Sequence, residues 1–130
     1  MDIEAFPWLF PPADAKVIDP NKAATLAGGV PSLVVLESLR GLQGYRGVIR
    51  HTDIFSSDFG SVAVPHSYFS IYKDGQPIPE YVRITMPLVP TIPVLIFLEP
   101  NQTLELKAIN LTANPIAVRY RLTGWYWRTT

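Results

Sequence analysis

The sequence predicts an all-β domain, and three observations support this class. Prolines account for 13 of the 130 residues, about twice the usual share. Each proline removes a backbone donor and fixes φ, which disfavours long helices. From residue 45 onward, short runs alternate apolar and polar positions, with turn residues between them at intervals of ~8–12 positions. This pattern is typical of an antiparallel sandwich or barrel in a single domain.

The first dozen residues differ from the rest, because large apolar side chains alternate with prolines at 6–12 (FPWLFPP). We expect an extended N-terminal arm over 1–15, followed by one β-sandwich domain over 16–130. Phe6, Trp8 and Phe10 are too apolar to stay free in water. The arm therefore covers an edge of its own sandwich or reaches a neighbouring subunit, and the sequence leaves both open.

At most one short helix is expected. Asp19 is a candidate N-cap, Pro20 suits the first helical position, and good helix formers follow over 22–27. The paired glycines at 28–29 would end this helix. The next segment, 32–39, has leucines at helical spacing, but Val34 and Val35 favour a strand, which is our interpretation.

The β pattern begins at 45–54 and continues after a serine-rich loop at 56–61. A strand is expected at 68–72, and Asp74-Gly75 predicts a hairpin turn into a return strand at 78–84. Pro77 and Pro79 would confine that return strand to a sheet edge.

The three last strands are expected at 92–98, 103–110 and 116–122. In the first, both faces carry apolar residues, so we expect both to be at least partly buried. In the second, Leu104 and Leu106 point inward, while Glu105 and Lys107 point outward. The last strand has the clearest alternation in the chain, with its inward positions at Ile116, Val118, Tyr120 and Leu122.

No pattern predicts an enzyme or a resident cofactor. The candidate metal ligands are two histidines and two aspartates, and the chain has 0 cysteines. These ligands are His51, His66, Asp53 and Asp58. A catalytic triad drawn from Ser56, Ser57, Asp58 and His66 lacks the Gly-x-Ser-x-Gly elbow, so a turn-capping role is favoured. The glutamates at 80, 99 and 105 fall in separate turns and strands.

Two clusters near the C-terminus are candidate partner-binding residues. Arg119 and Arg121 share one face of the last strand and either bind a partner or keep the sheet soluble. Trp125 and Trp127 share a face opposite Tyr126, which indicates a core plug or a subunit contact. The alternative is a carbohydrate-binding module that uses all three aromatic rings.

Composition excludes some partners. The formal net charge is +0, whereas nucleic-acid binding normally requires a basic excess. The apolar stretch 86–98 is too short to span a bilayer and contains three prolines, so no membrane contact is expected. The N-terminus lacks the basic and apolar regions of an export signal, so we expect synthesis in the cytoplasm without secretion.

Several segments of the C-terminal two thirds resemble small jelly-roll proteins of tailed-phage virions. They are 92–110 (IPVLIFLEPNQTLELKAIN), 118–127 (VRYRLTGWYW), 44–50 (GYRGVIR), 57–59 (SDF) and 74–78 (DGQPI). Proteins of this kind share a Pro-Asn or Pro-Gly turn, an Ala-x-Asn strand end and a closing Arg-Leu-x-Gly-Trp strand. The resemblance covers roughly 45–127, and its motifs mark positions in the fold.

The resemblance implies a jelly-roll-like sandwich that acts as a head decoration (cement) or minor head protein without enzymatic activity. The expected partners are the major capsid protein or other virion proteins, together with further copies of the chain, most simply as a homotrimer. The expected contact residues are those with large aromatic or guanidinium groups. They are Phe6, Trp8, Phe10, Arg119, Arg121, Trp125 and Trp127.

Overall fold

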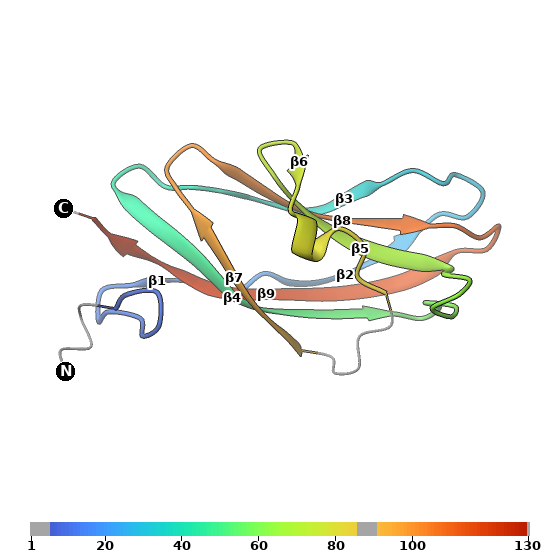
Figure 1. The fold of residues 1–130 in the computed structure, drawn as a ribbon, viewed down its shortest axis with the longest axis horizontal. Coiled ribbons are helices and arrows are strands. Elements are labelled where there is room, and N and C mark those ends of the chain that lie inside the picture. Colours follow the sequence, from blue (N-terminus) through green and yellow to red (C-terminus); the bar gives the residue numbers. More distant parts are fainter. Residues whose placement is uncertain (1–5, 86–90, 130) are drawn as a thin grey trace.

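A computed structural model describes residues 6–85 and 91–129 as two antiparallel sheets packed face to face. Figure 1 shows the two layers, with both termini at one end. Sheet A contains β1 (Lys16–Ile18), β2 (Asn21–Leu26), β9 (Ile116–Arg128), β4 (Tyr45–Ser56) and β7 (Thr91–Leu98). Sheet B contains β3 (Val34–Arg40), β8 (Thr103–Asn110), β5 (Ser67–Lys73) and β6 (Gln76–Pro77). The expected all-β sandwich is confirmed.

The strand order is that of a jelly-roll-like sandwich. In sheet A, β1 and β2 both pair with β9, and then come β4 and β7. In sheet B the order is β3-β8-β5-β6. Strands β2 to β5 alternate between the sheets along the chain, and so do β7 to β9. Each sheet is therefore built from segments that are far apart in sequence.

The core lies between the sheets and follows the alternation of the strands. Along β9, the inward residues are Ile116, Val118, Tyr120 and Leu122, all buried, while the residues between them are exposed or half-buried. Leu104 and Leu106 of β8 are buried opposite them. These two alternation patterns were predicted from the sequence and are confirmed.

The helix expected at 22–27 is wrong, because this segment is the edge strand β2. Residues Asn21–Leu26 pair in register with Arg121–Ile116 of β9. Leu26 is buried in the core and Ala24 packs against it. Local propensity favoured a helix here, but pairing with β9 fills an open edge and buries the leucine. No helix of seven or more residues occurs in the described ranges.

The segment 32–39 was interpreted as a strand, and β3 confirms this. Its register with β8 shifts between Val35 and Glu37, so Leu36 is the extra residue of a bulge. The Asp74-Gly75 hairpin is also confirmed, with φ values of 52° and 80° at these two residues.

One expectation about a strand is wrong. The return strand at 78–84 does not form, because β6 ends at Pro77 and a short 3₁₀ helix, η2 (Pro79–Tyr81), follows. Pro77 and Pro79 lack the N–H groups that a longer ladder would need. Both faces of β7 are at least partly buried, as expected: on the outer face Phe97 is half-buried and Leu95 is about half exposed. No helix in the described part of the chain is long and apolar enough to cross a membrane.

Candidate functional site on the outer face of sheet A

The outer face of sheet A is the side of that sheet that points away from the core. The alternation of β9 places Arg119, Arg121, Trp125 and Trp127 on this face, while Tyr126 points into the core. Phe55 of β4 lies beside Arg119, and Asp53 lies beside Arg121. Four of the seven predicted contact residues therefore share one surface.

The N-terminal arm folds back onto this surface. The indole nitrogen of Trp125 donates a hydrogen bond of 2.6 Å to the carbonyl oxygen of Pro7. The Phe6 and Trp8 rings pack edge to face, with 5.6 Å between their centroids. The sequence left open whether the arm covers its own sandwich or a neighbouring subunit. In the structure, the described part of the arm lies on its own sandwich.

The backbone of the arm is not extended throughout. The amides of Leu9 and Phe10 both donate to the carbonyl oxygen of Phe6, at 3.0 and 3.1 Å. Pro7 explains this turn, because its fixed φ suits the second position of a β-turn. The turn leaves the Leu9 and Phe10 side chains about half exposed.

A second, smaller apolar layer lies on the outer face of sheet A at the end where the arm binds. Val48 and Trp127 point to the outer face, yet their exposed fractions are only 0% and 7%. Neither belongs to the cluster between the sheets. An open hollow of about 650 Å³ remains beside this layer, and Trp8, Asp14, Arg46 and Arg128 line it. The arm end of sheet A is thus largely covered by the chain itself.

The two arginines on the outer face differ in their ion pairing. Arg121 donates two hydrogen bonds to the Asp19 carboxylate, at 2.6 and 3.0 Å. These bonds lower the pKa of Asp19 below its ordinary value and raise the pKa of Arg121. Arg119 makes no ion pair with any residue in the described ranges.

Two shallow hollows flank the Arg119 side chain, with volumes of about 340 and 300 Å³. Phe55 lines both of them and is about half exposed. Small residues of β2 and β9, including Ala23 and Ala117, form the floor of the second hollow. The described part of the arm does not line these two hollows, so this half of the outer face can accept the side chains of another molecule.

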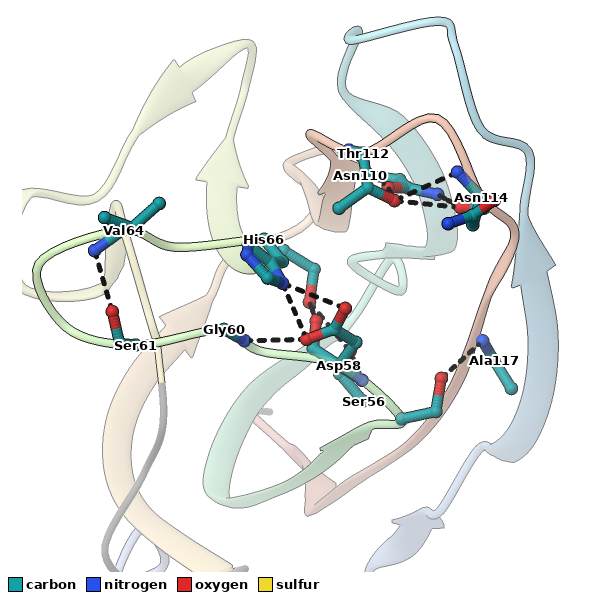
Figure 2. Close-up of polar contacts among 12 residues, drawn as sticks. Ser56, Asp58, Gly60, Ser61, Val64, His66, Asn110, Thr112, Asn114 and Ala117 are labelled. Atoms are coloured by element: carbon teal, nitrogen blue, oxygen red, sulfur yellow. Dashed lines mark hydrogen bonds and ion pairs between the residues drawn. The ribbon is translucent and has the colours of Figure 1, made fainter.

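The residues considered for catalysis lie at the end of β4 and in the loop between β4 and β5. Figure 2 shows the Asp58 carboxylate bound to Nδ1 of His66, with both oxygens at 2.9 Å, and to the amide of Gly60. The Ser56 hydroxyl is buried and bonds to the Ser67 hydroxyl at 2.7 Å. Ser57 Oγ accepts a bond from the amide of Ala117. Neither Ser56 nor Ser57 hydrogen bonds to the His66 ring, so the cluster braces the loop.

The residues weighed as metal ligands do not form one cluster, because only Asp58 and His66 bind each other. His51 is exposed on β4, and Asp53 accepts a hydrogen bond from Thr91. Within residues 6–85 and 91–129, no three histidine or acidic side chains are placed to hold a metal ion.

Sequence reasoning missed some exposed apolar residues on this face, among them Phe55, Leu95 and Val17. The signal for Phe55 was present, because it follows the inward Ile54 in an alternating strand.

Comparisons with protein-family models, with curated proteins and with solved structures found no match. The function is therefore argued from the residues and the fold.

Proposed function

We propose that the protein is a non-enzymatic structural component of a tailed-phage virion, a head decoration or minor head protein that self-associates and binds the capsid surface. The outer face of sheet A would be the surface that binds the capsid. The observation that carries the proposal is the half of this face away from the arm, where Phe55 and Arg119 line two hollows and Arg119 has no ion pair within the described residues. Exposed apolar groups beside arginine are typical of protein interfaces.

Two further points support the proposal. The jelly-roll-like strand order agrees with the resemblance to virion proteins, although this fold also hosts lectin domains and cupins. The arm is anchored through the Pro7 carbonyl, so Leu9 and Phe10 are presented from a fixed turn. Apolar side chains held in this way lose little conformational entropy when a partner covers them.

The arrangement of the arm weakens the carbohydrate-binding alternative. A sugar platform needs an open aromatic face, but Trp127 is buried and the Trp125 ring nitrogen is bonded to the arm. Tyr126 points into the core. Of the three rings, none offers an uncovered face comparable to that of Phe55 on β4.

Two measurements test the proposal. Antibodies raised against the purified protein should label particles of the phage that encodes it, and particles without label would contradict a virion role. Purified protein should also co-sediment with capsids that lack it. The Phe55→Asp variant should lose this binding, whereas Val35→Asp, an equally half-exposed position on sheet B, should retain it. An equal loss of capsid binding in both variants would contradict the assignment of the capsid-binding surface to sheet A.

A further inference from the structure

Three connecting loops meet at the end of the sandwich opposite the arm (Figure 1). They are 27–33 between β2 and β3, 57–66 between β4 and β5, and 111–115 between β8 and β9. We call this surface the loop end. The amide of Gly29 donates to the carbonyl oxygen of Thr112 at 2.9 Å, and the amide of Leu111 donates to that of His66 at 2.8 Å. The three loops are therefore joined directly to one another.

Asn110 fixes the base of the loop end. Its side-chain amide donates to the carbonyl oxygens of Leu26, Ala27 and Asn114, at 3.2, 3.4 and 2.7 Å. Its carbonyl oxygen accepts from the amide and the hydroxyl of Thr112. Asn110 is buried, so these bonds are shielded from water and hold β2, β8 and β9 in place.

The loop 57–66 is a rigid projection (Figure 2). Asp58 binds His66 and the amide of Gly60, and the Ser61 hydroxyl accepts from the amide of Val64 at 2.9 Å. Gly60 has φ of +75°, and a Cβ there would lie 2.5 Å from the Val64 carbonyl oxygen. Only glycine fits this close approach, so the conformation is built into the sequence.

This rigid surface presents apolar side chains to solvent. Val62 and Val64 at the tip have exposed fractions of 80% and 62%. Val30 and Leu111 on the neighbouring loops are 60% and 41% exposed. A fixed backbone that carries uncovered valines is typical of a contact surface, because a partner can cover them without ordering the loop first.

The loop end also carries few ionisable groups. The chain has 11 basic and 11 acidic residues, yet within the three loops the only charged or titratable groups are Asp58 and His66. The Asp58 carboxylate and Nδ1 of His66 are 2.9 Å apart and bind each other. The surface has no cluster of basic residues for a polyanion or for acidic lipid headgroups. It matches a partner surface that is likewise apolar and carries little charge.

We propose that the loop end is the self-association surface, where a second copy of this chain docks through its own loop end. An apolar patch whose only two ionisable side chains bind each other is complementary to itself, which is what a closed contact between identical subunits requires. The inference deepens the proposed function and rests on its self-association part. It leaves the outer face of sheet A free for the capsid.

The test compares two valines of nearly equal exposure. Val62 is 80% exposed at the loop end, and Val17 is 78% exposed on β1 of sheet A. Sedimentation velocity over a micromolar range should show the wild type and Val17→Asp at a multiple of 14.5 kDa. Val62→Asp should shift to the monomer, with association weakened about tenfold or more. Circular dichroism should show the same fold in all three proteins.

Several results would overturn the inference. They are a monomeric wild type, an oligomer that survives Val62→Asp, and equal loss in both variants. A monomer that binds capsids or neutral lipid vesicles in a Val62-dependent way would assign the loop end to another protein or to a membrane, and would also refute self-docking. Labelling of virions tests the proposed function separately, because it does not depend on Val62.

Discussion

The two ends of the sandwich differ in the exposure of two pairs of outward-pointing apolar side chains, one pair buried at the arm end and the other exposed at the loop end. At the arm end, Val48 and Trp127 point away from the core but are buried, and the N-terminal arm lies beside them, bound to Trp125. At the loop end, Val62 and Val64 are uncovered, although the backbone beneath them is held by a dense set of hydrogen bonds. Burial stabilises the first region, whereas polar contacts fix the second and leave its apolar groups available.

Because of this difference, we expect the residues that stabilise the fold and the residues that bind a partner to lie at different ends of the sandwich. Side chains that the chain itself covers contribute to its own stability. Side chains that stay exposed on a fixed loop contribute almost nothing to stability and can contribute to binding. Substitutions at the two ends should therefore change different measured quantities.

The largest effect on stability is expected at the arm end. Trp127→Ala should lower the free energy of unfolding by about 3 kcal/mol, because it leaves a cavity beside the arm. Phe55→Ala on the same face is the control and should change it by less than about 0.5 kcal/mol, since Phe55 is half exposed. Urea denaturation measures both. Similar losses in the two variants would mean that Trp127 is not buried in solution.

A somewhat smaller loss is expected at the base of the loop end. Asn110→Ala leaves three carbonyl oxygens and the Thr112 amide without their side-chain partner. The expected cost is about 2 kcal/mol of unfolding free energy. Asn114→Ala, at an exposed position, should be close to neutral in the same assay. A neutral Asn110→Ala would show that the network does not hold the loops.

Gly60→Ala should have a modest effect on stability and a clear one on association. A methyl group there meets the Val64 carbonyl at 2.5 Å, and the positive φ adds strain, together about 1–2 kcal/mol. Gly75 also has a positive φ but has open space around it, so Gly75→Ala serves as the control. If both variants self-associate like the wild type, the conformation of the loop tip is irrelevant to docking.

Val62→Asp should change stability least, by less than about 0.5 kcal/mol, because the side chain is exposed. Thermal melting at a concentration where the protein is monomeric isolates this effect from association. A large decrease in melting temperature would show that Val62 stabilises the fold. It would contradict the proposed difference between the arm end and the loop end.

The sequence predicted the parts of the fold that local alternation determines. The inward positions of β8 and β9 and the Asp74-Gly75 turn are confirmed. Strand β2 was mistaken for a helix because its nearby residues favour one. Its state is decided by pairing with β9, nearly a hundred residues away. Such distant pairing has no local signal.

The candidate surfaces were predictable to different degrees. The common face of Arg119, Arg121, Trp125 and Trp127 follows from the period of a strand. The bond from Trp125 to Pro7 joins the two ends of the chain, and no spacing rule brings them together. Val62 and Val64 lie just beyond the loop that composition predicted at 56–61. Their exposure depends on the Asp58–His66 and Gly60 contacts, which the sequence does not display.

Methyl NMR of valine-labelled protein, recorded from low to high micromolar concentration, tests the central claim most directly. The account predicts that the signals of Val62 and Val64 shift together with concentration, while those of Val17 and the buried Val48 stay constant. Signals at Val62 and Val64 that do not change while the protein self-associates would contradict the account. So would shifts confined to Val17 on the outer face of sheet A.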